Sequence, residues 1–128
     1  MKKLIIDGGL LLTDMEIQYK ERNIHLTRVL IDTGSSCSII SSEIAESIGI
    51  FPEADDPIYR VCGVGGSEIV YAKVLDSITI GHIKTEQIQI EIGSMNYGFD
   101  LDGIIGLNLL KRLKASINIE KLVIQYEC

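Results

Sequence analysis

Alternation of apolar and polar residues dominates this chain and predicts β-strands. The run EQIQIEI at residues 86–92 places three isoleucines on one face and three polar residues, Glu91 among them, on the other. This period of two is typical of a half-buried strand. The run SITI at 77–80 alternates in the same way, and residues 81–86 read as the bend between the two strands.

Three further stretches predict hairpins or strand pairs. Residues 16–31 read as two strands around a polar turn at 20–23, and residues 116–126 read as a closing hairpin. The N-terminal run MKKLIIDGGLLLTDM is split by an Asp-Gly-Gly sequence into two short apolar halves. Such a sequence between apolar segments favours a strand, a tight turn and a second strand.

Two stretches break the alternation and predict short helices. Residues 41–49, SSEIAESIG, offer a serine cap, a glutamate in the first turn and Gly49 as a stop. Residues 107–113, LNLLKRL, space leucines at helical intervals and carry two cations late, where they suit the helix dipole. The segment 51–57, between two prolines, reads as a surface loop. With no linker visible, we expect a mostly β fold with two short helices in one domain, residues 1–128.

Composition narrows the function and the cellular setting. The 128 residues are 46% hydrophobic, with 5% aromatic residues and no Trp, so the core must come from Ile, Leu and Val. The net charge of −6, without a basic block, argues against nucleic-acid binding. No segment approaches the roughly 18 apolar residues of a membrane span, so no membrane partner is expected. The three cysteines lie far apart and form no CxxC or Cys/His cluster, which predicts reduced thiols, a cytoplasmic location, and no metal or cofactor.

The run VLIDTGSSCSII at residues 29–40 carries the candidate chemistry. An apolar strand ends on Asp32, and a second apolar run begins at Ile39. Aspartate at a strand end often bonds nearby backbone N–H groups, and that ordinary reading stays open for the tripeptide alone. The apolar flanks, however, predict a carboxylate with little water around it.

Three motifs in order resemble those of aspartic proteases. LIDTGS resembles their catalytic loop, CGVGGSEIVYAKV is similar to the glycine-rich flap hairpin of the retroviral type, and DGIIGLNLL resembles the late apolar-apolar-Gly element with its helix. The resemblance covers about residues 24–126. It implies a small closed β-barrel of the retropepsin-like acid protease type, with the length of a single lobe.

The resemblance also implies a function and a partner. It implies an aspartic endopeptidase that hydrolyses a peptide or protein substrate as a homodimer, with Asp32 from each subunit meeting at a two-fold axis. Thr33 is expected to bond the partner's loop across that axis. Gly34 is expected to bring its N–H to the carboxylate of Asp32, and Ser35 to donate its hydroxyl to the same carboxylate.

The flap and the termini carry further expectations from the resemblance. Gly63, Val64, Gly65, Gly66 and Ile69 are expected to cover and bind the substrate, with Gly65 and Gly66 at the tip. Val64 and Ile69 would line the cavity. The first nine residues and the last seven would pair across the dimer.

Other readings of the same residues remain. Residues 30–41 and 100–110 echo one another, each with an Asp, a Gly and two Ile before a predicted helix, which indicates two half-repeats. Asp100 or Asp102 is a weaker candidate for a second catalytic carboxylate within one chain, and a structural bond to the turn is favoured for Asp102. The whole chain could also be a non-catalytic peptide-binding or dimerisation module on the same fold.

Overall fold

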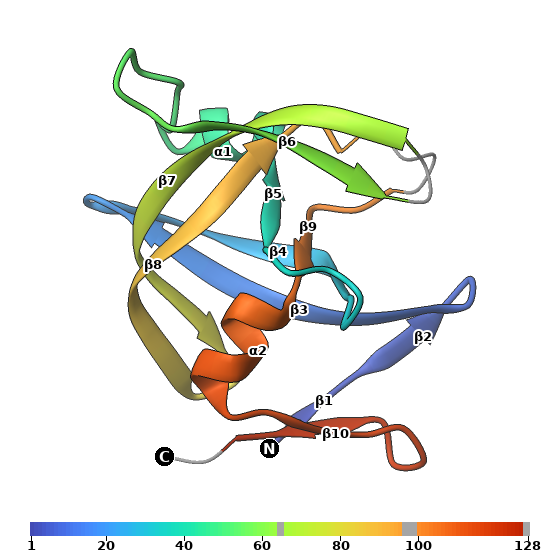
Figure 1. Cartoon of the computed structure of the whole chain (residues 1–128). Helices are drawn as coiled ribbons and strands as arrows, with labels where there is room; N and C mark the ends of the chain where they lie inside the picture. The colour runs from blue at the N-terminus through green and yellow to red at the C-terminus, as the bar shows by residue number, and fades with distance from the viewer. Residues whose placement is uncertain (64–65, 96–99, 127–128) are drawn as a thin grey trace.

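The chain is mostly β with two short helices, as the alternation predicted (Figure 1). A computed structural model describes residues 1–63, 66–95 and 100–126. The helices are α1 (Ser42–Ser47) and α2 (Leu107–Leu113). The strands are β1 (Lys2–Lys3), β2 (Ile5–Asp7), β3 (Leu10–Tyr19), β4 (Arg22–Ile31), β5 (Ile39–Ser41), β6 (Ile58–Gly63), β7 (Gly66–Ile80), β8 (Ile83–Gly93), β9 (Gly103–Ile105), β10 (Ser116–Asn118) and β11 (Val123–Gln125). Neither helix is long and apolar enough to cross a membrane, which holds for the described residues.

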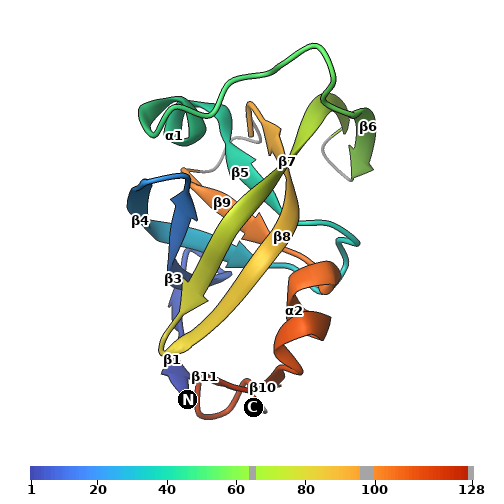
Figure 2. The ribbon, with the colours of Figure 1, turned by 90° about the vertical axis from the view of Figure 1, so that its left-hand side faces the viewer.

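Eight strands form one sheet that closes on itself. Their order is β2-β3-β4-β9-β5-β8-β7-β6, and a further pairing between β3 and β7 joins the sheet into a ring. Figure 2 shows β7 and β8 crossing the front of this ring, with α1 near one end and α2 on its flank. A closed ring leaves few unpaired strand edges, and here β2 and β6 are the two ends of the sheet order.

The hairpins follow the sequence predictions, with tighter turns. The first joins β2 to β3 through Gly8 and Gly9, whose φ angles of 59° and 81° suit glycine. Tyr19 pairs with Arg22, so the β3–β4 turn holds two residues where four were predicted. The β7–β8 turn is equally short. Polar residues at these hairpin ends still join the ladder, because backbone pairing does not depend on side-chain polarity.

Aliphatic side chains fill the ring. The largest fully buried side chains are all isoleucine or leucine, as the composition predicted: Ile17, Leu26, Ile40, Ile50, Leu75, Ile78, Ile80, Ile88, Ile90, Ile92, Ile105 and Leu109. A second, smaller apolar cluster is separate from this core. We call it the outer cluster, and it consists of Leu12, Ile39, Met95, Leu101 and Ile104, with Leu10, Leu30, Cys37 and Val61 packed against it.

The internal echo has a structural counterpart. β9 lies parallel to β4 and leads into α2, while β5 lies parallel to β8 and leads into α1. β5 and β9 pair antiparallel in the middle of the sheet. Each half of the echo is therefore a short strand beside a hairpin strand, followed by a helix, and the two halves run in opposite directions.

The chain ends meet in a small sheet of their own. β1 pairs with β11, Lys2 opposite Ile124, and β11 pairs with β10 as the predicted closing hairpin. These strands pair within one chain, with β1 and β10 at the edges of the small sheet. The expected pairing of the terminal segments across a dimer remains a prediction. Figure 1 shows both ends of the chain together at the base of the molecule.

The loop at residues 51–57 lies at the surface and is tied down by one buried cation. The ammonium group of Lys73, on β7, lies 2.5 Å from Glu53 Oε1 and 2.9 Å from Asp56 Oδ2. Burial lowers the pKa of Lys73, but the bonds to these two carboxylates outweigh burial and raise it overall. The ion pairs keep Lys73 charged in a site with 6% side-chain exposure.

Candidate active site

Asp32 lies in a turn immediately after β4, and backbone hydrogen bonds hold both its main chain and its carboxylate. Its N–H donates to the carbonyl of Ile105 at 2.9 Å, which continues the β4–β9 ladder by one bond. The N–H of Gly34 donates to Asp32 Oδ1 at 2.9 Å, and the N–H of Ser35 donates to the Asp32 carbonyl at 3.1 Å. A Cβ on Gly34 would lie 3.2 Å from Oδ1, so the close approach favours glycine. This N–H bond is the one expected for Gly34 from the resemblance.

Ser35 binds the loop rather than the carboxylate. Its hydroxyl donates to the carbonyl of Cys37 at 2.8 Å, and its own carbonyl accepts from the N–H of Leu107 at 2.8 Å. The expectation that Ser35 donates to Asp32 is thus not met. The hydroxyl instead binds a carbonyl two residues later within the same turn.

The loop after Asp32 rests on the start of α2. A Cβ on Gly106 would lie 2.1 Å from the Cys37 carbonyl oxygen and 2.7 Å from that of Ser35. The N–H of Gly106 donates to Ser38 Oγ at 3.0 Å, and Ser38 Oγ donates to Asn108 Oδ1 at 2.7 Å. The sequence interpretation missed Ser38, Gly106 and Asn108 as positioning residues. The only signal for them was the second glycine of DGIIG, which is Gly106.

Thr33 presents its hydroxyl to the outside. The residue is exposed, and within the described part of the chain its hydroxyl has no hydrogen-bond partner. A polar group at the outer face of a rigid turn is available to a second molecule. The expected bond across a two-fold axis remains a prediction.

Asp102 is a structural residue. Its Oδ2 accepts hydrogen bonds from the N–H groups of Thr27 and Arg28, both at 3.2 Å. The register of β4 and β9 places Asp102 opposite Arg28, four residues before Asp32. At about 3.3 Å per residue this separates the two aspartates by roughly 13 Å, which is too far to share a proton. The favoured structural interpretation agrees with this geometry.

The β6–β7 hairpin is the expected flap, and it projects above the Asp32 loop (Figure 1). Its ladder runs outward to the pair Gly63 and Gly66; Val64 and Gly65 lie outside the described residues. Ile69 pairs with Arg60 and is 65% exposed, on the opposite face from Val61. Because Val61 packs against the outer cluster, the register directs Val61 toward the cleft and Ile69 away from it. The expectation that Ile69 lines the cavity is corrected accordingly.

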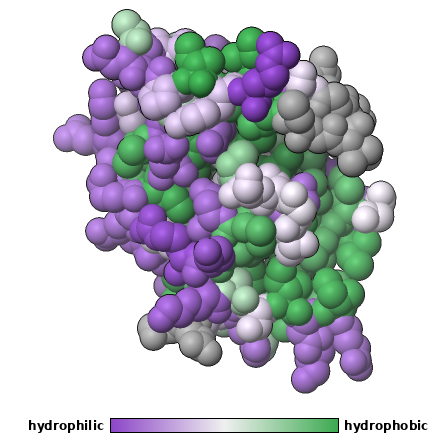
Figure 3. All heavy atoms as spheres, viewed as in Figure 1, coloured by the Kyte–Doolittle hydropathy of each residue, from purple (hydrophilic) through white to green (hydrophobic). Residues whose placement is uncertain are grey.

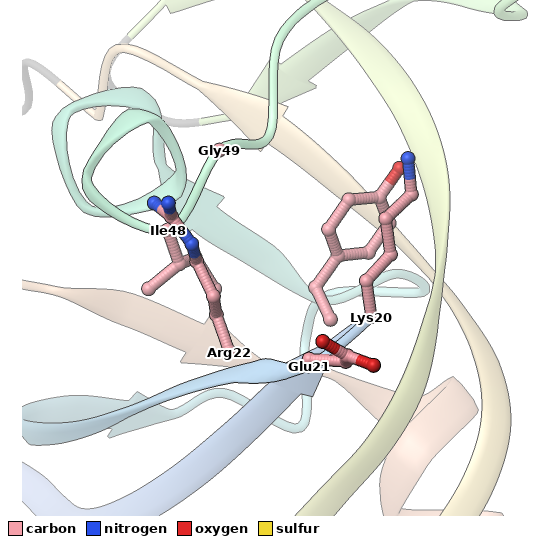
Figure 4. A pocket seen from close by; sticks show the side chains of 6 residues that line it. Lys20, Glu21, Arg22, Ile48 and Gly49 are labelled. Atoms are coloured by element: carbon pink, nitrogen blue, oxygen red, sulfur yellow. The ribbon is translucent and has the colours of Figure 1, made fainter.

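One cavity of the described residues lies away from Asp32. A cavity of about 480 Å³ opens at the β3–β4 turn, at the opposite end of β4 from Asp32. Figure 4 shows its lining side chains, which come from this turn and from the end of α1: Tyr19, Lys20, Glu21, Arg22, Ile48 and Gly49. No group of three or more His, Cys, Asp or Glu side chains in the described ranges is arranged to hold a metal ion.

Comparison with known proteins agrees with the site and the fold. A family model described as "gag-polyprotein putative aspartyl protease" matches residues 21–112, which include the Asp32 turn, the flap hairpin and most of α2. The chain belongs to the retropepsin-like aspartic protease family. A solved retropepsin-like aspartic protease from Rickettsia conorii has the same fold, with a TM-score of 0.65 and 21% identity over 95% of this chain and 86% of that one.

Curated relatives of this retropepsin-like chain are longer proteins. DNA damage-inducible protein 1 of Yarrowia lipolytica is 29% identical over 84% of this chain, and that of Neurospora crassa is 32% identical over 78%. UBA domain-containing protein Mud1 of Schizosaccharomyces pombe is 28% identical over 82%. The matched regions cover 26%, 23% and 31% of these three proteins. The chain thus corresponds to about a quarter to a third of their length.

The retropepsin-like fold of this chain buries one acidic residue that the sequence pattern placed on a polar face. Glu91, near the end of β8, is only 8% exposed. Burial raises the pKa of its carboxyl group above the usual 4.5. The alternation did not predict this burial, because Glu91 continues the polar face of Gln87 and Gln89, both of which are exposed.

Proposed function

We propose that this chain is an aspartic endopeptidase that acts as a homodimer and uses Asp32 from each subunit. The observation that carries the proposal is the turn geometry at Asp32. The Gly34 N–H holds one carboxylate oxygen, and the whole turn is fixed to β9 and α2. A carboxylate held this firmly at a protein surface can meet its symmetry copy in a defined geometry.

The chemistry follows from bringing two such carboxylates together. Two carboxylates about 3 Å apart cannot both ionise, so they share one proton, as in other aspartic proteases. The ionised member removes a proton from a water molecule, and the protonated member donates to the scissile carbonyl oxygen. Hydroxide attack then gives a tetrahedral diol without a covalent enzyme adduct. The pair titrates as a unit.

Three features support the dimer. Asp102, the carboxylate considered as a partner for Asp32 within one chain, is bonded to the backbone of Thr27 and Arg28 instead. The Thr33 hydroxyl is exposed beside it without a partner. Leu107, whose N–H binds the Ser35 carbonyl, is 41% exposed at the start of α2. Figure 3 shows apolar side chains gathered over the right-hand part of this view, in contrast to the polar left. Exposed apolar surface of this kind marks an interaction site.

An extended peptide is the proposed substrate. The flap strand β6 ends the eight-strand order, so one of its edges is unpaired within the described residues. An extended main chain can add to such an edge while its side chains enter pockets on alternate sides. A single domain over residues 1–128 and a reducing, cytoplasmic location are parts of the same proposal. The free thiol of Cys37 supports the location.

The test is hydrolysis of a mixed peptide pool between about pH 4 and pH 7, the range in which carboxylate pairs titrate. Asp32→Asn should lower kcat/KM by at least about a thousandfold, because the amide cannot activate water. The matched control is Asp55→Asn, which changes an exposed aspartate of the 51–57 loop and should leave the rate unchanged. Hydrolysis that survives Asp32→Asn would refute the proposal.

A non-catalytic peptide-binding or dimerisation module on the same fold is the alternative. It is favoured by one observation, that Asp102 is bonded to the backbone of Thr27 and Arg28 and so does not pair with Asp32 within one chain. Peptide binding without cleavage by the wild-type dimer, at every pH in that range, would select this alternative.

A further inference from the structure

We propose that Glu91 makes the cleft select a basic side chain, lysine or arginine, close to the scissile bond. This inference rests on the proposed peptide-binding function and specifies the class of substrate. It assigns a specificity role to Glu91, which does not belong to the Asp32 turn or to the flap.

The strand register places Glu91 on the cleft side of the sheet. Glu91 pairs with Ile39 of β5 on one side and with Ala72 of β7 on the other. Directly paired residues project from the same face, so the Glu91 side chain points to the side that carries Ile39. Ile39 and Ile104 are paired members of the outer cluster, and the flap residue Val61 packs against that cluster. Glu91 therefore lies in the wall between the flap and the loop that follows Asp32.

The active-site loop is next to this carboxylate. Cys37 packs against the outer cluster, and its carbonyl accepts the Ser35 hydroxyl. Burial and the nearby charge of Glu91 both raise the pKa of the Cys37 thiol. The neutral form of the thiol is therefore favoured, so Cys37 supplies no positive charge to Glu91.

Within the described residues, Glu91 has no cation beside it. It forms no ion pair and no hydrogen bond with another side chain there; only its own backbone N–H stabilises the charged form. Glutamate at 8% exposure is ordinarily paired, because an isolated buried charge is costly. A ligand that supplies the cation would remove this cost.

A second carboxylate reinforces the negative charge of the wall. Glu68, opposite Val61 in the flap hairpin, accepts a hydrogen bond from Ser94 Oγ at 2.9 Å. Its carboxylate lies over Gly93, where a Cβ would be 3.0 Å from Glu68 Oε1. Gly93 is two residues beyond Glu91 on the same face of β8, a distance of about 7 Å. Two acidic groups thus lie on one wall of otherwise apolar composition.

Lysine and arginine suit such a wall. Their aliphatic stems can lie along Ile39 and Val61 while the charged head reaches the carboxylate of Glu91. In a homodimer each subunit contributes the same wall, so a basic residue is preferred at equivalent positions on both sides of the cut.

Binding measurements isolate this subsite from catalysis. The full chain carrying Asp32→Asn is titrated at pH 7 with fluorescent octapeptides of apolar residues. One position at a time carries either lysine or its uncharged analogue norleucine. We expect one position on each side of the centre to favour lysine by about tenfold or more, the scale of a charged hydrogen bond. Adding Glu91→Gln should abolish that preference, whereas Glu86→Gln, an exposed glutamate on the same strand, should preserve it.

Each outcome decides the inference. Equal affinity for lysine and norleucine at all positions would overturn the inference, and this result needs no variant at residue 91. A lysine preference that persists in folded Glu91→Gln would also overturn it. Cleavage of the same peptides by the wild-type chain is scored separately. Lysine selectivity without cleavage would refute the proposed endopeptidase activity and support the Glu91 subsite. Cleavage without lysine selectivity would support the endopeptidase and refute the subsite.

Discussion

Burial of the Glu91 carboxyl group lowers the stability of the folded protein. Its pKa is raised by burial, so the folded protein binds its proton more tightly than the unfolded chain does. Below the unfolded pKa the neutral carboxyl carries no penalty. As the pH rises through the unfolded and then the folded pKa, the folded state loses stability relative to the unfolded state.

Glu91→Gln should therefore stabilise the protein at neutral pH. We expect the free energy of unfolding at pH 7 to rise by roughly 1 kcal/mol, the scale of an uncompensated buried polar group. The gain should shrink as the pH falls toward 4 and the wild-type carboxyl becomes neutral. Urea unfolding at several pH values measures it. Glu86→Gln on the same strand is the control, and a wild-type chain more stable than Glu91→Gln at pH 7 would show that Glu91 has a stabilising partner.

Ser35→Ala should leave the pH dependence of catalysis in place. The Ser35 hydroxyl donates to the Cys37 carbonyl and not to Asp32, so its loss does not change which form of the carboxylate pair is favoured. We expect an unshifted pH profile of kcat/KM and a loss of about 0.5–1.5 kcal/mol in the free energy of unfolding. A displaced profile would mean that the hydroxyl turns to Asp32 once substrate is bound.

Residue-level chemistry was predictable where a motif constrains it locally. Asp32 and Gly34 follow from DTG, because the turn and the N–H bond involve neighbours in sequence. The contacts of Ser38 with Gly106 and Asn108 join positions about 70 residues apart, and nothing local encodes them. The burial of Glu91 was not predicted, because its neighbours in the sheet, Ile39 and Ala72, are distant in sequence and local alternation does not show them.

At the scale of elements, the loop after Asp32 depends on the close approach of α2. Gly106→Ala should break this contact, because its Cβ would fall 2.1 Å from the Cys37 carbonyl oxygen. Backbone must move to relieve such a clash, and overpacking costs about 1–3 kcal/mol. We expect a loss of that size in the free energy of unfolding.

The same displacement should reach Asp32 and lower kcat at least tenfold even where the variant is fully folded. Lys111→Ala, an exposed change on the same helix, controls for general effects on α2. Thermal unfolding together with peptide hydrolysis provides the two readouts. Normal kcat in folded Gly106→Ala would show that the loop does not need this contact.

Helices and strands with a clear sequence signal were predicted, whereas the strands that pair with one another over long sequence distances were not. Helix α2, strand β8 and the last four residues of β7 follow from their periodicity. Helix α1 follows from its end signals: it ends at Ser47, and Gly49, the predicted stop, has a φ of 83°. The parallel pairings of β4 with β9 and of β5 with β8 join distant segments, and the pattern within each strand does not name its neighbour. The serine expected to cap α1 is at the N-cap as Ser41, but its side chain makes no capping bond there.

At the scale of the whole molecule, the three-stranded terminal sheet bears on how a dimer would form. β1 and β11 pair within one chain, so the termini need not be exchanged to satisfy their backbone groups. The Asp32 turn and the exposed apolar residues near it, such as Leu107, can also hold two subunits together. The contacts of the turn should then govern both association and activity.

Thr33→Val tests this link, because it keeps the side-chain shape and removes only the hydroxyl. A two-fold axis uses each contact twice, so the dissociation constant of the dimer should rise by about 10- to 100-fold if each lost bond is worth about 1 kcal/mol. Activity should fall at low enzyme concentration and recover at high concentration, since the subunits that still meet keep both carboxylates. Sedimentation velocity and the concentration dependence of kcat/KM measure the two effects.

Thr79→Val, which removes a hydroxyl at the far end of β7, is the control. A monomer with undiminished activity would place the second catalytic group within one chain and so contradict the position found for Asp102.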